Sequence, residues 1–279
     1  MVEKNRTAKL IAICAFLALL CVIFLFPVYW TLITSFKLPN EIFVEKPLYV
    51  INTLHLDHYY EIFTKSLVMT YFTNSATISL AATLATIVLA TLAGYGISRS
   101  RTRLARAVQN SVIIVRMIPA ILYTIPLYII YNEIGLIDTK VGLTLAYITF
   151  SLPLAIWLSI VFYKDIPDEI YESAEIDGCS ELRTYSKIAL PLITPGIAVI
   201  CILVFIGAWN EFGLALVLQF SDANKTIPVG IASMVQTHQD TPSGSLAAAG
   251  MIAIIPAIII SLTTQKYIVR GLMAGAVKG

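Results

Sequence analysis

The feature that most constrains this sequence is a set of long stretches without charged side chains. A helix rises 1.5 Å per residue, so about 20 apolar residues cross the hydrocarbon core of a bilayer. Four stretches of that length contain no Asp, Glu, Lys or Arg, and two more contain one charge each, Arg116 or Glu211. The six stretches are residues 10–36, 66–98, 107–132, 141–163, 188–221 and 241–265. The sequence therefore predicts an all-α membrane protein with six transmembrane helices.

The overall composition agrees with a chain embedded in a lipid bilayer. Of its 279 residues, 58% are hydrophobic and only 13% are charged, and the mean hydropathy is +0.81. The 19 basic and 17 acidic residues nearly cancel, which gives no reason to expect a nucleic-acid partner. The first apolar stretch follows three basic residues, as in a signal peptide, but it is longer than the roughly 7 to 15 residues of a cleavable apolar region. We expect it to be retained as an anchor.

The distribution of Lys and Arg predicts the orientation of the chain. If the N-terminus is inside, 13 of the 19 basic residues lie on the cytoplasmic side and five lie outside, with Arg116 inside a span. Cytoplasmic loops of membrane proteins keep the excess of positive charge. Both termini are therefore expected in the cytoplasm.

Sequence motifs of catalysis are missing. There is no G-x-x-x-x-G-K-[ST] loop that could hold the phosphates of ATP. The three histidines all fall on the expected outer side, and neither a Cys/His cluster nor a nucleophile elbow is found. The four cysteines suggest neither a disulfide nor a metal site. We expect no catalytic residue, metal or cofactor in this chain.

One expected cytoplasmic connection, residues 166–195, is long and polar and predicts a helical hairpin. Its sequence is IPDEIYESAEIDGCSELRTYSKIALPLITP. Pro167 suits the first turn of a helix, and Gly178 suits the end of that helix, in a conformation with positive φ. A second helix is expected from about Ser180 to Pro191. The apolar edge of this hairpin must pack either on the chain's own helices or on a separate protein.

The hairpin resembles the "EAA" loop of ATP-binding-cassette (ABC) importer permeases. The residues that carry the resemblance are Glu172, Ala174, Asp177, Gly178, Ile188, Leu190 and Pro191. The sequence departs from the family pattern at Ser173 and Cys179, where alanine is usual, and both are small enough that we expect no change of role. The resemblance implies that the loop 164–195 couples the chain to a separate ATPase. It also implies that Glu172 pairs with an arginine of that ATPase.

Further motifs along almost the whole chain are similar to those of carbohydrate-importer permeases, in particular the second permease subunit of maltose-type transporters. They are PVYWTLITSFK at 27–37, NSATIS from Asn74, LAGYGISR at 92–99, RMIP at 116–119, WNEF at 209–212 and the terminal GLMAGAVKG. This resemblance implies a type I ABC importer permease fold in the plasma membrane of a prokaryote. It divides the chain into a cytoplasmic N-terminus (1–9), a transmembrane permease domain (10–268) and a cytoplasmic C-terminal tail (269–279).

The same resemblance implies a set of partners. They are a second permease that forms a heterodimer with this chain, two ATPase subunits that bind ATP and Mg²⁺, an extracytoplasmic solute-binding protein and a sugar-like solute. The particular sugar stays undecided. An alternative of another class is a secondary active transporter, which also uses a bent bundle but has no ATPase partner. Such a transporter is expected to carry ion-coupling acids in its helices, and Glu211 is the only acidic residue inside a predicted span.

Several polar and aromatic side chains inside the predicted spans are candidates for the solute path or its gate. Arg116 lies roughly 15 Å deep, where an ionised group is costly unless it is paired or wet. Glu211, a partner permease or a water-filled cavity could compensate it. Sugars are held by aromatic faces and hydrogen-bonding groups, so the candidates are Arg116, Tyr123, Tyr128, Tyr131, Trp209, Asn210 and Glu211. Tyr and Trp also gather at bilayer interfaces, which leaves both interpretations open.

The orientation yields a labelling prediction. A cysteine introduced at Glu45 is expected to react with a membrane-impermeant thiol reagent added to intact cells, because Glu45 lies in an expected outer loop. A cysteine introduced at Glu181 is expected to react only after the membrane is permeabilised. The reverse labelling pattern would overturn the orientation.

Overall fold

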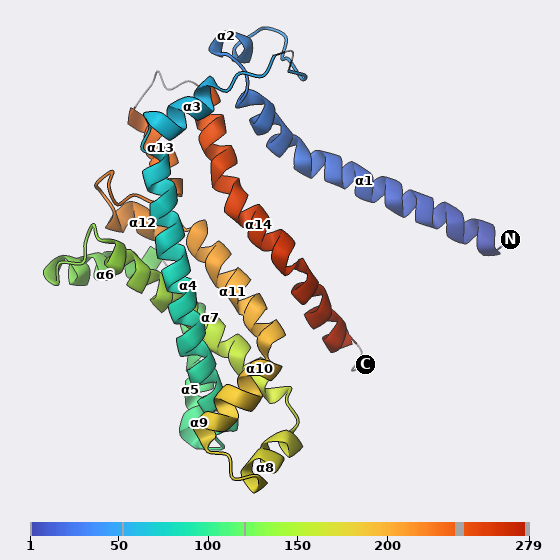
Figure 1. The fold of residues 1–279 in the computed structure, drawn as a ribbon, viewed down its shortest axis with the longest axis vertical. Helices are drawn as coiled ribbons and strands as arrows, with labels where there is room; N and C mark the ends of the chain where they lie inside the picture. The colour runs from blue at the N-terminus through green and yellow to red at the C-terminus, as the bar shows by residue number, and fades with distance from the viewer. Residues whose placement is uncertain (1, 52, 120, 238–242, 277–279) are drawn as a thin grey trace. The chain divides into compact units, whose positions relative to one another are not determined.

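The computed structural model describes residues 2–51, 53–119, 121–237 and 243–276, which form helices joined by turns and loops (Figure 1). The chain divides into two compact units. Unit 1 comprises residues 1–69 and 231–254, and unit 2 comprises residues 70–230 and 255–279. The all-α prediction is confirmed. The last three residues of the predicted C-terminal tail, 277–279, lie outside the described residues.

The helices follow one another in this order. They are α1 (Val2–Thr34), α2 (Pro39–Ile42), α3 (Asp57–Thr64), α4 (Val68–Arg99), α5 (Arg103–Arg116), α6 (Ile121–Glu133), α7 (Lys140–Lys164), α8 (Asp168–Ile176), α9 (Glu181–Thr184), a π-helix (Tyr185–Ala189), α10 (Leu190–Leu192), α11 (Thr194–Trp209), α12 (Gly213–Leu218), α13 (Ile227–Thr237) and α14 (Ser243–Ala276). The predicted domain boundaries at residues 9 and 268 fall inside α1 and α14, so no change of secondary structure marks them.

Four uninterrupted helical segments in the described residues are long and apolar enough to cross a membrane. They are Lys9–Thr34 of α1, α4, α7 and Ser243–Thr263 of α14. Two bent pairs meet the same test of length and composition, α5 with α6 and the helices of 181–192 with α11. If each bent pair is one span, the number of spans is the six that the charge-free stretches predict.

Two predicted spans are not single helices, which corrects the sequence analysis. In the stretch 107–132, α5 and α6 meet at 100°. Pro119 lies in the break, where it has no N–H to donate and disfavours helical backbone at the preceding residue. In the stretch 188–221, the chain turns by 77° ahead of Thr194 and the long helix ends at Trp209, well before Ser221. A separate short helix, α12, follows.

Helix α7 is the centre of unit 2, where it packs against α5, α11 and α12. Small side chains line these contacts: Ala82 of α4, Ala146 of α7 and Ala215 of α12 belong to one buried cluster. Small residues let helix backbones approach closely within a membrane. Such a close approach is found at Gly94 of α4, where an added Cβ would overlap the Cβ of Ser159 and lie 3.2 Å from the backbone nitrogen of Ile160 in α7.

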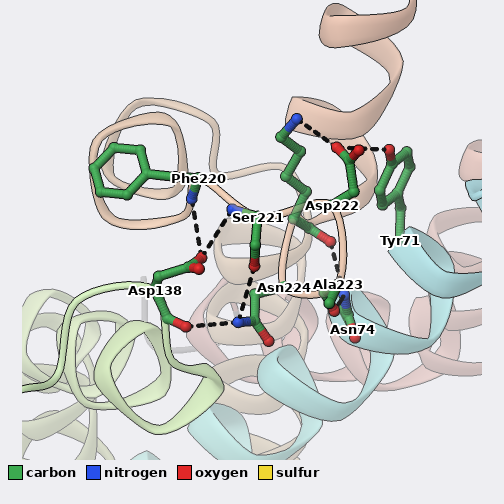
Figure 2. Close-up of polar contacts among 9 residues, drawn as sticks. Tyr71, Asn74, Asp138, Phe220, Ser221, Asp222, Ala223 and Asn224 are labelled. Carbon is green, nitrogen blue, oxygen red and sulfur yellow. Dashed lines mark hydrogen bonds and ion pairs between the residues drawn. The ribbon is translucent and has the colours of Figure 1, made fainter.

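A network of hydrogen bonds joins the α6–α7 turn to the loop between α12 and α13 (Figure 2). Asp138, which has a φ of 55°, accepts hydrogen bonds on its carboxylate from the backbone N–H of Phe220 (3.0 Å) and of Ser221 (3.1 Å). The side-chain amide of Asn224 donates to the backbone carbonyl of Asp138 at 2.6 Å. Burial acts to raise the pKa of Asp138, but the hydrogen bonds outweigh it and hold the pKa below its usual value. The carboxylate is therefore ionised at neutral pH.

The same loop is also fixed to α4 (Figure 2). Asp222 accepts hydrogen bonds from the hydroxyl of Tyr71 (3.3 Å) and the ammonium of Lys225 (2.6 Å). The amide of Asn74, which is buried in α4, donates to the backbone carbonyls of Ala223 (2.8 Å) and Lys225 (3.0 Å). Residues 219–226 are thus a fixed connection, because their backbone groups are bonded to side chains of α4 and of the α6–α7 turn.

In unit 1, the buried imidazole of His58 joins α3 to the first turn of α14. Its Nε2 lies 3.0 Å from the backbone carbonyl of Lys37, and its Nδ1 lies 3.1 Å from the hydroxyl of Ser245. Ser245 in turn donates to the carboxylate of Glu61 at 3.2 Å. The bond to the Lys37 carbonyl requires the hydrogen on Nε2, because a carbonyl oxygen only accepts. Gly244 leaves space for the ring, since an added Cβ there would overlap it.

The close contact at Gly94 yields a stability prediction with a control two residues away. Gly94→Ala is expected to lower the stability of the purified protein by about 1 to 3 kcal/mol, because the new methyl group collides with α7. Gly96→Ala, at a position with no atom within 4 Å of the new Cβ, is expected to be neutral or to stabilise α4 by up to about 1 kcal/mol. Thermal unfolding of both variants in detergent checks this. Equal melting temperatures for the two variants would contradict the close α4–α7 contact.

Candidate functional site

Residues 166–195 contain a short helix, a tight turn at Gly178 and a second helical arm, and we call this segment the hairpin. The first arm is α8, which has Asp168 and Glu169 in its first turn and follows Pro167 directly. Gly178 has a φ of 74°, which confirms the predicted left-handed conformation at the end of this helix. The turn is closed by hydrogen bonds from Gly178 N–H to the Glu175 carbonyl (3.0 Å) and from Cys179 N–H to the Ala174 carbonyl (2.9 Å). A residue with positive φ therefore sets the angle between the two arms.

The second arm begins and ends close to the predicted positions. Ser180 precedes α9, and the arm continues through the π-helix to Leu192 at the end of α10. The wider π turn was not predicted. Pro191 has no N–H to bond the carbonyl of Lys187, four residues earlier, which favours a local departure from the α-helical pattern.

The hairpin has two different faces. Ala174 is buried, and Ile188 and Leu190 are partly buried against the rest of unit 2. By contrast Glu172, Asp177, Gly178 and Pro191 are exposed, together with two large apolar side chains, Ile176 (87% exposed) and Leu182 (71% exposed). The sequence left two alternatives for the hairpin, packing on the chain's own helices or on a separate protein, and these do not exclude each other. One face packs on the chain's own helices, and the other face presents acidic and apolar groups to the surroundings.

The buried face of the hairpin is built from tyrosines, which the sequence analysis missed. The ring of Tyr95 in α4 contacts those of Tyr163, Tyr171 and Tyr185, with centroid distances of 5.5, 6.4 and 5.3 Å. Ile193 is buried in the same cluster. A sequence signal was available, because Tyr95 and Arg99 lie one helical turn apart in the motif LAGYGISR. Tyr171 and Tyr185 lie in the two arms of the hairpin.

The candidate path residues Arg116 and Tyr123 lie on either side of the α5–α6 break and meet at Phe150 of α7. The guanidinium of Arg116, which is exposed, lies 3.5 Å from the Phe150 carbonyl, and the ring of Tyr123 lies 5.7 Å from the Phe150 ring. Tyr128 packs at 6.3 Å against Phe220, whereas Tyr131 is buried in the core beside α7. The structure therefore brings Arg116 and Tyr123 together at Phe150, whereas Tyr128 and Tyr131 have other neighbours.

The candidates in the motif WNEF occupy the end of α11 and have different surroundings. Trp209 is buried, stacked on Phe205 at a centroid distance of 5.7 Å and edge-on to Phe72 at 5.4 Å. Asn210 is exposed at the break between α11 and α12. Of the candidates in this motif, Asn210 therefore lies at the protein surface and Trp209 lies in the core.

Glu211 stabilises the start of α12. Its carboxylate accepts hydrogen bonds from the backbone N–H groups of Leu214 (2.8 Å) and Ala215 (3.0 Å) and from the hydroxyl of Tyr147 (3.1 Å). A carboxylate at a helix N-terminus satisfies N–H groups that have no partner within the helix. These bonds give Glu211 a role that does not involve Arg116, since the hydrogen bond of Arg116 goes to α7.

A protein family described as binding-protein-dependent transport system inner membrane component matches residues 86–273. The chain is 38% identical to the trehalose transport system permease protein SugB of Mycobacterium tuberculosis, over 91% of this chain and 93% of that protein. It is 34% identical to the trehalose/maltose transport system permease protein MalG of Thermococcus litoralis, over 94% of each chain.

The fold is similar to that of one chain in a solved membrane transporter. A chain from the crystal structure of a bacterial ABC transporter involved in the import of the polysaccharide alginate superposes with a TM-score of 0.79, at 20% identity, over 92% of this chain and 95% of that one. The family match supports an ABC permease and not the alternative of a secondary active transporter. The chain belongs to the family of binding-protein-dependent transport system inner membrane components and is a transmembrane permease subunit of an ABC importer.

Proposed function

We propose that the exposed face of the hairpin binds a separate ATPase and that this chain couples ATP hydrolysis there to the movement of a sugar. The observation that carries the proposal is the two-faced hairpin. Glu172, Asp177 and Gly178 are exposed beside the apolar side chains of Ile176 and Leu182. Exposed apolar groups rimmed by charges are typical of protein–protein contacts. The buried residue Ala174 and the partly buried residues Ile188 and Leu190, with the neighbouring Pro191, shape the hairpin for this contact.

The chain acts in this scheme without catalysis of its own. ATP and Mg²⁺ are bound by two ATPase subunits, since the sequence has no phosphate-binding loop. The hairpin and both termini face the cytoplasm, in line with the excess of Lys and Arg there. A second permease completes the membrane-spanning part as a heterodimer.

The end of unit 2 that lies away from the hairpin suits contact with an extracytoplasmic solute-binding protein. The loop 219–226 and the α6–α7 turn are joined there by the bonds of Asp138 and Asn224 (Figure 2). A rigid loop loses little conformational entropy on binding. One solved relative of this fold is an alginate transporter in complex with a pentasaccharide-bound periplasmic protein, with a TM-score of 0.66.

The solute is proposed to be a sugar, as the names of the permease relatives for trehalose, maltose and maltodextrin suggest. Arg116, Tyr123, Tyr128 and Asn210 are the proposed wall of the path, because none of them is fully buried within the chain. Trp209 and Glu211 support this wall from behind by fixing the α11–α12 break.

Coupling through Glu172 is tested against a matched acid on the same helix. In the complex reconstituted in liposomes with its ATPase and solute-binding protein, Glu172→Ala is expected to weaken ATPase binding at least tenfold. Leaving a desolvated arginine unpaired costs about 2 to 5 kcal/mol. Glu175→Ala removes the same charge from α8 outside the family pattern and is expected to bind the ATPase normally. Equal binding of the two variants would overturn the role of Glu172.

Gly178 offers a second test that separates conformation from side-chain size. Gly178→Val is expected to insert into the membrane but to bind the ATPase weakly, because a β-branched residue is strained at a φ of 74°. Gly178→Asn is expected to retain binding, since asparagine tolerates the left-handed region. No atom lies within 4 Å of an added Cβ, so collisions do not obscure the comparison. Normal binding by the valine variant would show that the turn angle does not matter.

The substrate class is tested by solute-stimulated ATP hydrolysis in the same liposomes. Trehalose or maltose is expected to stimulate hydrolysis when the solute-binding protein is present, whereas an amino acid such as histidine is not. Stimulation by the amino acid and by neither sugar would contradict the proposed substrate class while leaving the ABC permease assignment intact.

A further inference from the structure

Three residues of α4 share one face and each contacts a different part of the hairpin. Thr91, Tyr95 and Arg99 are spaced four residues apart, which places them on one side of a helix. Arg99 contacts α8, Tyr95 contacts α9, and Thr91 contacts the π-helix. We call these three residues the α4 contact face.

The contact of Arg99 with α8 is made of two interactions. Its guanidinium donates to the carboxylate of Asp168 at 2.8 Å and lies 4.0 Å above the ring of Tyr171. An exposed ion pair alone contributes little, and the side chain of Asp168 is 65% exposed. The stacking adds a second constraint on the guanidinium, so its plane and its direction are both fixed. Burial raises the pKa of Tyr171, and the charge of Arg99 acts in the opposite direction.

Tyr95 is buried, and its contacts reach both arms of the hairpin. Its hydroxyl donates to the carboxylate of Glu181 at 3.0 Å, while its ring packs against Tyr171 of the first arm and Tyr185 of the second. One turn before Tyr95 in α4, the hydroxyl of Thr91 lies 3.0 Å from the hydroxyl of Tyr185. Packed aromatic pairs contribute more than their area alone. The hairpin is therefore attached to α4 along three turns of the helix.

Helix α4 is in turn fixed to the centre of unit 2. Gly94, the residue before Tyr95, lies on another side of α4 and packs directly on the backbone of α7. Buried clusters consequently join the hairpin, α4 and α7 into one packed body in unit 2. Close-packed interiors transmit displacements because they have little free volume.

We propose that the hairpin and α4 move as one rigid body, with Tyr95 and Arg99 as the positioning residues that hold them together. A displacement imposed on the exposed face of the hairpin then reaches the middle of α4 without being absorbed at the joint. The proposal rests on the proposed function, in which an ATPase imposes that displacement. The competing arrangement is a hinge, in which the exposed Arg99–Asp168 pair opens and the hairpin swings against α4.

The distance between two spin labels distinguishes these arrangements. One label is placed at Glu175, which is exposed on α8, and the other at Leu84, which is 64% exposed in the middle of α4, after the four native cysteines are replaced. Electron paramagnetic resonance then measures the label distance in the complete complex, without nucleotide and after trapping with ATP and vanadate. The rigid body predicts the same mean distance in both states. A shifted mean would establish the hinge and overturn the proposal.

Variants test whether the α4 contact face is responsible. Arg99→Glu is expected to broaden the distance distribution, and adding Asp168→Arg is expected to narrow it again, because the swapped pair restores the attraction. Tyr95→Phe keeps the ring but removes the bond to Glu181, and it is expected to broaden the distance distribution less than Arg99→Glu does. Arg101→Glu makes the same change of charge at an exposed neighbour and is expected to leave the distance distribution unchanged. An unchanged width in Arg99→Glu would overturn the proposal.

The same samples separate this proposal from the proposed function. The amount of ATPase that purifies with each labelled complex measures docking, which depends on the exposed face of the hairpin. Absence of ATPase from the unsubstituted labelled complex would contradict docking. The widths of the distance distributions in Arg99→Glu and in the swapped pair would still show whether the hairpin and α4 move as one rigid body. Loss of ATPase binding in Arg99→Glu, without a change in width, would contradict the positioning role.

Discussion

The requirement that backbone polar groups be bonded within a membrane governs this fold. Regular helices meet it by themselves, but each interruption leaves N–H and C=O groups that need other partners. At the end of α11 the carboxylate of Glu211 supplies acceptors for Leu214 and Ala215. In α4 the amide of Asn74 supplies donors for the carbonyls of the loop that follows α12. Asn74 and Glu211 are therefore placed where they satisfy the backbone groups of interrupted segments.

This constraint explains why the sequence predicts some features and not others. Stretches without charges reveal where helices can cross a bilayer, and the position of Gly178 reveals a left-handed turn, because both are local properties of the chain. The break after α11 depends on a carboxylate that reaches forward into the next helix, and spacing alone does not distinguish that role from a pairing with Arg116. The contacts among Tyr95, Tyr163 and Tyr171 join segments far apart in the sequence. The one-turn spacing of Tyr95 and Arg99 therefore indicates a helix face but does not identify what packs on it.

The hairpin combines two demands that usually conflict. A surface that binds another protein has to be exposed, whereas a surface that passes on a displacement has to be held firmly. Here the two demands are met by different sides of α8: Glu172 is exposed, and Tyr171, the adjacent residue, is buried under Arg99. Successive residues on a helix point about 100° apart, which is enough to divide the roles between neighbours.

The π-helix at Tyr185–Ala189 sets the rotational phase of the second arm. Because it holds an additional residue in its turn, every side chain beyond it is rotated relative to an uninterrupted α-helix by about 100°. Tyr185 at its start and Ile193 beyond its end both reach the tyrosine cluster with this spacing. Deletion of a single residue here would preserve a helix of ordinary appearance and turn Ile193 away from the cluster. An irregular turn is thus what keeps the parts before and after it in register with the same neighbour.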